Sequence, residues 1–414
     1  MKPVTIALVG AGGRGLRCYA PYVSKHPERA TIVAVAEPRD EYKNEAIREF
    51  NIAPSRAFSC WQDLARQPRL ADAVIIATPD REHYHAAIAF AKLGYHILLE
   101  KPMAPTEREC REIVSAVKEH GNILAVCHVL RYAPYFRKLR EIINSGVLGT
   151  LAHINHTEHV GFWHFAHSYV RGNWRNEALS APSLLAKSCH DLDILLFLAQ
   201  RRCVSVFSSG NLLEFKSDMK PVGASERCTD CRYAERGCAY SASKFYQSRL
   251  DRGLTGWPLD VITTDVSKSG IGHALKNGPY GRCVYSCDND VVDHQLVAMS
   301  FEGGLTANFT MNAFSTDEYR QTEIFGTRGE ARGNNHQIVV RVFETGDVTS
   351  YDIAPQSGAH FGGDDALMRD FVDAVESQNP ELIASGPKIS LEGHLIVFAA
   401  ERSRKTGEAQ SICL

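Results

Sequence analysis

The segment VTIALVGAGGRG, residues 4–15, decides the fold of this chain. Its first half is a continuous apolar run, typical of a strand that is buried on both faces. Its second half has the spacing G-x-G-x-x-G and opens a helix, so glycines stand where the chain must turn tightly and approach a phosphate group. The segment therefore predicts the start of a parallel sheet whose first helix presents its N-terminus to an anion.

Glu37 is a second marker of a nucleotide site. It ends the strand-like run VAVAE, residues 33–37, at about the distance downstream at which an acid holds ribose hydroxyls in dinucleotide folds. A carboxylate there favours NAD, because it would repel the 2′-phosphate of NADP, although Arg39 could accept that phosphate. We predict that NAD, with NADP less favoured, is held by Gly10, Gly12, Gly13, Arg14, Gly15, Glu37 and Arg39.

The composition is that of an ordinary globular protein. Hydrophobic residues make up 44% of the 414 positions and charged residues 23%, and this length suggests two domains. Lys and Arg number 46 against 48 Asp and Glu, so there is no basic excess for nucleic acid or an anionic membrane. No apolar run reaches the roughly 18–20 residues of a membrane helix, and no export signal is evident, so we expect a cytoplasmic protein.

Hydrophobic periodicity divides the chain into two regions. In the first, short apolar runs alternate with helix-period stretches, the pattern of βαβ units. In the second, strands lie among long irregular segments before two C-terminal helices. The expected strands are 4–9, 31–36, 73–77, 96–99, 122–126, 152–158, 293–301 and 305–311, and the expected helices include 81–93, 106–120, 365–377 and 391–405.

We therefore predict an α/β protein with two domains. Residues 1–123 form a Rossmann dinucleotide-binding domain. Residues 124–414 form an α+β domain for substrate binding and oligomerisation, with a mostly antiparallel open sheet and a cysteine-rich insertion around 212–290.

Two further motifs connect the first region to a known family. They are ATPDREH at residues 77–83 and GYHILLEKP at residues 94–102. With the glycine motif they resemble the Gfo/Idh/MocA family, named for glucose-fructose oxidoreductase, inositol dehydrogenase and a rhizopine-catabolism protein. A weaker likeness continues through HDLD at 190–193 and FAAE at 398–401. The resemblance implies a nicotinamide cofactor, a sugar, polyol or cyclitol substrate, and a homodimer or homotetramer.

The resemblance also assigns roles to individual residues. Lys101 matches the lysine of the family's Glu-Lys-Pro motif, which contacts the substrate hydroxyl and the nicotinamide ribose. An ammonium group in that place can stabilise the negative charge that develops on a reacting alcohol. His190 matches the catalytic histidine, whose ordinary pKa suits proton exchange. The motif residues Thr78, Pro79, His83 and Glu100 are expected beside the cofactor.

The chain departs from the family just before His190. Many members have an aspartate four residues before that histidine, whereas this chain has Ala186, followed by Lys187. Lys187 could supply a compensating charge or bind an anionic substrate, and Asp191 could orient the imidazole. Either residue could equally be structural.

The segment WHFAHSYVRGNWR, residues 163–175, is the expected lining of the substrate pocket. Aromatic faces stack on sugars, and arginine forks recognise carboxylate, sulfonate or phosphate groups. An aromatic core loop with solvated arginines is the alternative. Tyr132 could position a hydroxyl, or it could simply be packed. The predicted contacts are Lys101, Tyr132, Trp163, His164, Arg171, Trp174, Arg175, Lys187 and His190.

Cys228, Cys231 and Cys238 form the spacing C-x2-C-x6-C in a polar stretch. Close thiolate pairs of this kind wrap tetrahedral zinc, so we predict a structural zinc ion. Cys283 is the first choice for the fourth ligand, ahead of Cys287 and Cys189. An iron–sulfur cluster and a set of reduced thiols are the alternatives.

The principal hypothesis is an NAD(P)-dependent oxidoreductase that transfers a hydride between nicotinamide and a carbinol carbon of a sugar, sugar derivative or cyclitol. An alternative is a glycoside hydrolase in which tightly held NAD oxidises sugar carbon 3 transiently, followed by elimination, hydration and re-reduction. A third hypothesis is a nucleotide-sensing regulator, which would give Lys101 and His190 no role.

Overall fold

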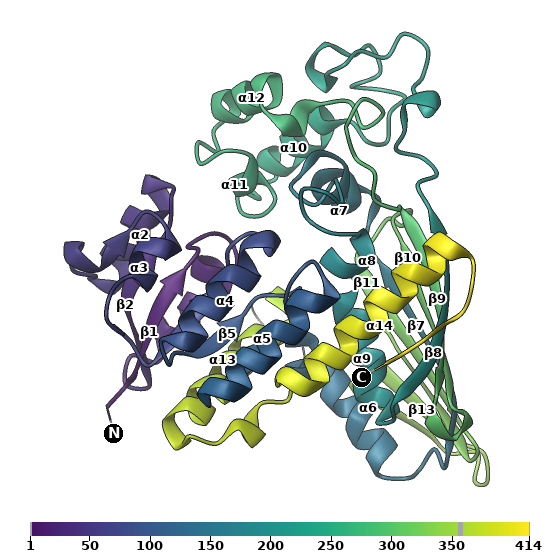
Figure 1. Cartoon of the computed structure of the whole chain (residues 1–414). Coiled ribbons are helices and arrows are strands. Elements are labelled where there is room, and N and C mark those ends of the chain that lie inside the picture. Colours follow the sequence, from purple (N-terminus) through teal and green to yellow (C-terminus); the bar gives the residue numbers. More distant parts are fainter. Residues whose placement is uncertain (1, 355–358, 414) are drawn as a thin grey trace.

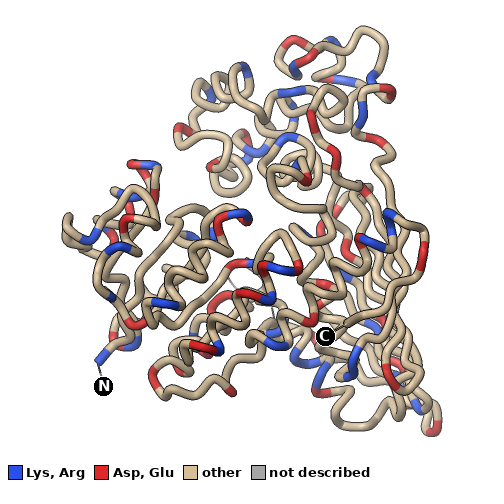
Figure 2. The backbone as a smooth tube through the Cα atoms, in the orientation of Figure 1, with Lys and Arg blue, Asp and Glu red and all other residues tan. Residues whose placement is uncertain are grey.

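The computed structural model describes residues 2–354 and 359–413, which contain two β-sheets with their covering helices (Figure 1). In this part of the chain no helix is long and apolar enough to cross a membrane. Acidic and basic side chains are interspersed along the chain, as expected from its near-zero net charge (Figure 2).

The first sheet is parallel, with the strand order β3-β2-β1-β4-β5-β6. Its central strands are buried along their whole length, which explains their continuous apolar sequences. The predicted Rossmann sheet is confirmed. The strands are β1 (Val4–Val9), β2 (Ala30–Ala36), β3 (Ala57–Phe58), β4 (Ala73–Ile76), β5 (His96–Leu99) and β6 (Leu124–Val126).

Helices cover both faces of this sheet and form two cores. One core is built with α3 (Trp61–Ala65), α4 (His83–Lys92) and α5 (Glu107–His120). The other combines α1 (Ala20–Lys25) and α2 (Asp40–Phe50) with α13 (Gly363–Ser377). Helix α13 comes from the C-terminal part of the chain and completes the core of the first sheet (Figure 1).

The second sheet has nine strands in the order β14-β13-β12-β11-β7-β10-β9-β8-β15 and is mostly antiparallel, as predicted. Strands β7 and β10 are the exception and run parallel. The bounds are β7 (Leu151–His159), β8 (Cys203–Asn211), β9 (His294–Phe301), β10 (Thr306–Asn312), β11 (Tyr319–Gly326), β12 (Gly329–Gly333), β13 (Gln337–Val342), β14 (Val348–Asp352) and β15 (Gln410–Ser411).

One face of the second sheet packs against α6 (Pro134–Asn144), α9 (Cys189–Ala199) and α14 (Pro387–Thr406) (Figure 1). The strands alternate buried residues with partly or fully exposed ones, so the opposite face is open to solvent. Short helices α7 (Phe162–Phe165) and α8 (Ser183–Ala186) precede α9. The insertion between β8 and β9 carries α10 (Ala242–Asp251), α11 (Leu259–Ile262) and α12 (Lys268–Asn277), which share a small core.

A buried ion pair links the segment after β6 to helix α9. The Arg131 guanidinium donates from Nε to Asp193 Oδ2 at 2.6 Å and from Nη2 to Oδ1 at 2.9 Å. The two side chains are only 5% and 1% exposed. Arg131 also donates to the Ala384 carbonyl oxygen, so three distant segments meet at this guanidinium.

We predict that Arg131→Met lowers the free energy of unfolding by about 3–5 kcal/mol, because it leaves the Asp193 carboxylate buried without its partner. Chemical denaturation measures the loss. The double variant Arg131→Met/Asp193→Leu should recover part of it, since no buried charge remains. An unchanged unfolding free energy in the single variant would contradict the assignment.

Candidate active site

The glycine turn lies at the carboxyl end of β1, between β2 and β4. Strand order reverses beside β1, and ligands of open parallel sheets bind at such a point. Gly10 has φ +89°, and a Cβ there would lie 2.4 Å from the Ala77 carbonyl oxygen. A Cβ at Gly15 would lie 2.0 Å from the Gly10 carbonyl oxygen, whereas one at Gly13 would meet nothing within 4 Å. The turn thus forms an open cradle that suits a pyrophosphate.

Glu37 lies beside this cradle. Its carboxylate accepts hydrogen bonds from the Ala11 N–H at 2.9 Å and from the Arg39 side chain, Nε at 2.7 Å. Burial alone would raise the pKa of Glu37, but the hydrogen bonds from Arg39 and Ala11 outweigh burial and lower it. The Arg39 side chain is 55% exposed, so releasing it from the carboxylate costs little. These residues fit the ribose of a dinucleotide.

His83 ties the two sequence motifs together. Its Nδ1 lies 2.7 Å from the Pro102 carbonyl oxygen and its Nε2 2.9 Å from the Thr78 carbonyl oxygen. Both ring nitrogens face carbonyl oxygens, so a neutral His83 donates to one of them and positions the two motif segments. Its contact with the cofactor stays a prediction. The Thr78 hydroxyl is buried without a hydrogen-bond partner within the described residues and is free to meet a ligand.

Arg14 and Glu100 face each other under the turn. Arg14 donates to Glu100 at 2.5 Å, to the Tyr19 hydroxyl at 2.5 Å and to Asp364 at 2.6 Å. Burial would raise the pKa of Glu100, but Arg14 and Lys101 outweigh it and lower it. Both side chains therefore bind each other across the interior, a placement that favours a supporting role over the predicted direct contact with the cofactor.

Lys101 follows β5, and its peptide bond to Pro102 is cis. Its Nζ donates to the Ala186 carbonyl oxygen at 2.7 Å. The ammonium at the edge of the first sheet thus reaches the backbone of Ala186, the residue at which the resemblance implies an aspartate.

His190 lies at the start of α9 and is 3% exposed. Neither imidazole nitrogen has a hydrogen-bond partner among the described residues. Burial, followed by the charge of Lys101, lowers the pKa of His190 well below its ordinary value, so the ring is neutral. A neutral imidazole with free nitrogens can accept a proton from an alcohol.

His128 is a site residue that sequence reasoning missed. It is buried, and neither ring nitrogen has a hydrogen-bond partner within the described residues, although Nδ1 lies 3.9 Å from Asp193 Oδ2. Its ring lies edge-on to His190 with centroids 5.8 Å apart. The available signal was its position directly after β6, at the same sheet edge as Lys101. The prediction instead named Tyr132, whose hydroxyl lies 2.8 Å from Ser385 Oγ and also accepts the Ser385 N–H. Tyr132 is thus packed against Ser385, and its contact with a substrate stays a prediction.

The Asp191 carboxylate has partners other than His190. Arg320 donates from Nε to Asp191 Oδ1 at 2.6 Å, and His156 Nε2 lies 3.0 Å from the same oxygen. The proposed orientation of the His190 imidazole by Asp191 is therefore corrected, because its carboxylate is fully engaged on the sheet side of α9.

Lys187 lies between two glutamates that the sequence did not single out. Its Nζ is 3.1 Å from Glu158 Oε1 and 3.6 Å from Glu318 Oε1. Burial would lower the pKa of Lys187, but the two carboxylates outweigh it and raise it, so the ammonium stays charged. Burial raises the pKa of Glu158, while Arg320 and Lys187 oppose this by contacting the same oxygen.

The predicted lining segment divides into two groups. His164 Nδ1 lies 3.1 Å from Glu318, and Trp163 stacks on Phe245 of the insertion. Trp174 is 37% exposed and donates from Nε1 to Asp80. These side chains remain candidates for the pocket.

The arginines of this segment have other partners, which corrects the prediction that they recognise an anion. Arg171 is buried and donates to the carbonyl oxygens of Arg282 and Tyr240. Arg175 donates to Asp288 at 2.8 Å. Both hold the insertion against the segment between α7 and α8.

Comparison with known families covers most of the chain. Residues 4–128 match the model of an oxidoreductase family with an NAD-binding Rossmann fold, and residues 140–409 match the C-terminal α/β domain of the same family, Gfo/Idh/MocA. The chain belongs to this family. The NAD-binding description agrees with the cradle formed by the glycine turn and Glu37.

Three similar proteins illustrate the range of the Gfo/Idh/MocA family. YteT of Bacillus subtilis (strain 168) is 22% identical over 72% of this chain and 71% of its own length. D-glucoside 3-dehydrogenase of Escherichia coli (strain K12) is 29% identical over 36% of this chain and 42% of its own length. The solved structure of levoglucosan dehydrogenase with NADH and levoglucosan has a TM-score of 0.72 at 17% identity, covering the whole of both chains. At this identity the likeness shows the fold alone.

The predicted zinc site is not supported. The four chosen cysteines do line one small cavity of about 20 Å³, so the sequence grouped them correctly. However, no group of three or more His, Cys, Asp or Glu side chains in the described ranges could hold a metal ion. Cys228 Sγ already accepts the Ala242 N–H, and burial raises the pKa of the Cys238 and Cys283 thiols. None of them forms a disulfide in the described residues.

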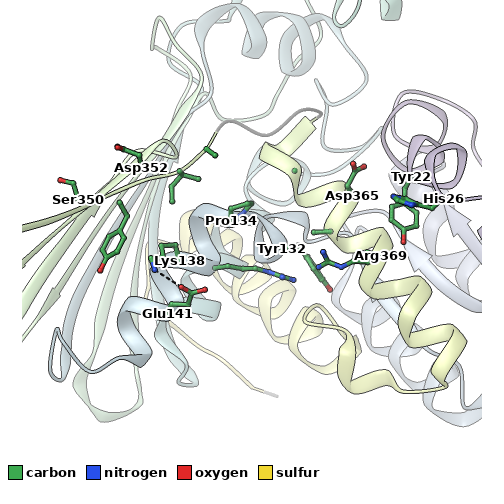
Figure 3. Close-up of a pocket in the computed structure, with 16 residues that line it drawn as sticks. Tyr22, His26, Tyr132, Pro134, Lys138, Glu141, Ser350, Asp352, Asp365 and Arg369 are labelled. Atoms are coloured by element: carbon green, nitrogen blue, oxygen red, sulfur yellow. Dashed lines mark hydrogen bonds and ion pairs between the residues drawn. The ribbon is translucent and has the colours of Figure 1, made fainter. Parts of the chain in front are cut away.

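A separate cavity of about 890 Å³ lies between α6, β14 and α13 (Figure 3). Figure 3 shows Lys138 paired with Glu141 at this cavity, and Tyr132 and Arg369 also line it. Neither Lys101 nor His190 lines it. It is therefore distinct from the candidate active site.

We predict that His190 stays neutral well below the pH at which an exposed histidine titrates. Burial lowers its pKa, so protonation requires a lower pH than about 6.5. Histidine-selective NMR between pH 7.5 and 5.5, with His190→Asn to assign the resonance, measures this. A His190 resonance that titrates near pH 6.5 would contradict the prediction.

Proposed function

We propose that this protein is an NAD-dependent oxidoreductase that transfers a hydride between nicotinamide and a carbinol carbon of a sugar, sugar derivative or cyclitol. The observation that carries the proposal is one contact: the Lys101 ammonium, at the carboxyl edge of the first sheet, donates to the Ala186 carbonyl oxygen, just before the helix that carries His190. The His190 imidazole has no hydrogen-bond partner in the described residues. The dehydrogenase names of similar proteins support it.

The cofactor site favours NAD over NADP. Bound NAD supplies a nicotinamide ring that accepts or donates the hydride. The glycine turn would hold its pyrophosphate, and Glu37 would accept hydrogen bonds from the ribose hydroxyls in place of those from Arg39. A 2′-phosphate would lie against the same carboxylate, which repels it.

Lys101 and His190 have different roles at the substrate hydroxyl. Lys101 donates a hydrogen bond to the substrate oxygen and stabilises its developing negative charge. His190 accepts the hydroxyl proton at one of its free imidazole nitrogens. Asp191 and Arg320 keep α9 in place through the sheet and do not touch the reacting atoms.

We also propose that a second copy of the chain covers the outer face of the nine-stranded sheet. Phe207 on β8 and Leu296 on β9 are 43% and 42% exposed there. Apolar side chains on an uncovered sheet face favour association. This proposal retains the prediction of a homodimer or homotetramer.

We predict that Glu37→Gln weakens NAD binding about tenfold, which is about 1.4 kcal/mol, and weakens NADP binding less. The amide keeps the shape of the side chain but loses the charge that strengthens hydrogen bonds from the ribose. Isothermal titration with both nucleotides measures the change. Arg39→Ala is the matched control and should leave NAD affinity within about twofold.

The function is tested with the purified protein, NAD and a panel of sugars, cyclitols and aryl glycosides, recording NADH and aglycone together. We expect NADH without aglycone release, and a loss of at least about 100-fold in kcat for Lys101→Met with NAD binding retained. Aglycone release without NADH would replace this proposal with the redox-neutral glycoside hydrolase. Unchanged turnover in Lys101→Met would contradict the assigned mechanism.

A further inference from the structure

The cations next to the Lys101–His190 cluster already have carboxylate partners. Lys187 follows Ala186, whose carbonyl oxygen holds Lys101, and its ammonium lies between Glu158 and Glu318. Its side chain is 13% exposed. An ammonium enclosed in this way has little capacity to bind a further anion.

Arg320 and Arg14 are neutralised in the same way. Arg320 contacts Asp191 and Glu158, each at 2.6 Å. Arg14 lies between Glu100 and Asp364. Each guanidinium therefore has two acidic partners and no unpaired positive charge to offer.

The charged groups around the reacting residues leave no excess of positive charge. Lys101, Lys187, Arg320 and Arg14 are four cations, and Glu158, Asp191, Glu318, Glu100 and Asp364 are five carboxyl groups. An entering carboxylate would add an uncompensated charge to a largely buried region, which is costly.

The neutral histidines add no positive charge. Burial lowers the pKa of His190 and of His128 well below the ordinary value. Their ring nitrogens lack hydrogen-bond partners within the described residues. Uncharged hydroxyl groups can both donate to and accept from such nitrogens.

We propose that the site takes sugars that carry hydroxyl groups and excludes the corresponding sugar acids, and that Glu318 sets this preference by neutralising Lys187. This inference rests on the proposed function and names its substrate class. Glu318 is the accessible member of the pair, with a side chain 34% exposed against 1% for Glu158. Glu318 also lies 3.1 Å from His164, so it connects the lysine to the predicted lining segment.

The test compares methyl β-D-glucoside with methyl β-D-glucuronide, which differ only in the hydroxymethyl or carboxylate group at carbon 6. Full-length wild type, Glu318→Gln and Asp317→Asn are assayed with NAD at pH 8, where the carboxylates of the cluster are ionised. Both ligands are also titrated calorimetrically into each enzyme with NAD present, so preference is measured even without turnover. Melting curves confirm that the variants fold.

We expect wild type to favour the glucoside at least tenfold in affinity or kcat/KM. Glu318→Gln leaves Lys187 with one carboxylate and should reduce that ratio at least tenfold by improving the glucuronide. Asp317→Asn removes a neighbouring negative charge without touching Lys187 and should leave the ratio unchanged. Wild-type preference for the glucuronide, equal binding of the two, or an unchanged ratio in Glu318→Gln overturns the inference. Preferential glucoside binding with no NADH from any sugar overturns the proposed function instead.

Discussion

The hydrogen bond from the Lys101 ammonium to the Ala186 carbonyl oxygen joins the two halves of the site. Lys101 follows the end of β5, and Ala186 ends α8, just before the first turn of α9 that contains His190. A lysine at the edge of a parallel sheet therefore reaches a helix that packs with the other sheet. This contact fixes Lys101 relative to the segment that leads to His190.

A carbonyl oxygen holds an ammonium differently from a carboxylate. A carboxylate at residue 186 would cancel the charge of Lys101, whereas the carbonyl oxygen supplies only a dipole. Burial is the main cause that lowers the pKa of both His190 and His128, and the charge of Lys101 adds to it. Both imidazoles are therefore neutral.

Local patterns predicted the parts of the structure that depend on local interactions. Strands β1, β2, β4 and β5 are continuous apolar runs, and the glycine turn requires glycine for reasons that its own backbone imposes. Strand β3 has two residues and is too short to show a period. The packing of α13 into the first core and the parallel pairing of β7 with β10 join segments far apart in the chain, which periodicity cannot report.

The hydrogen-bond partners of the site residues also come from distant segments, so local sequence could not predict them. Asp191 and Arg171 were assigned to the pocket because of their chemistry, yet their partners, Arg320 and the Arg282 carbonyl oxygen, come from elements more than a hundred residues away. Each of these side chains is buried, and a buried charged side chain must pair with the polar groups that the fold places beside it. The residues left for chemistry are those whose polar atoms the fold leaves unsatisfied. In the described chain, His190 and His128 meet that criterion beside Lys101, and only the first was visible from its motif.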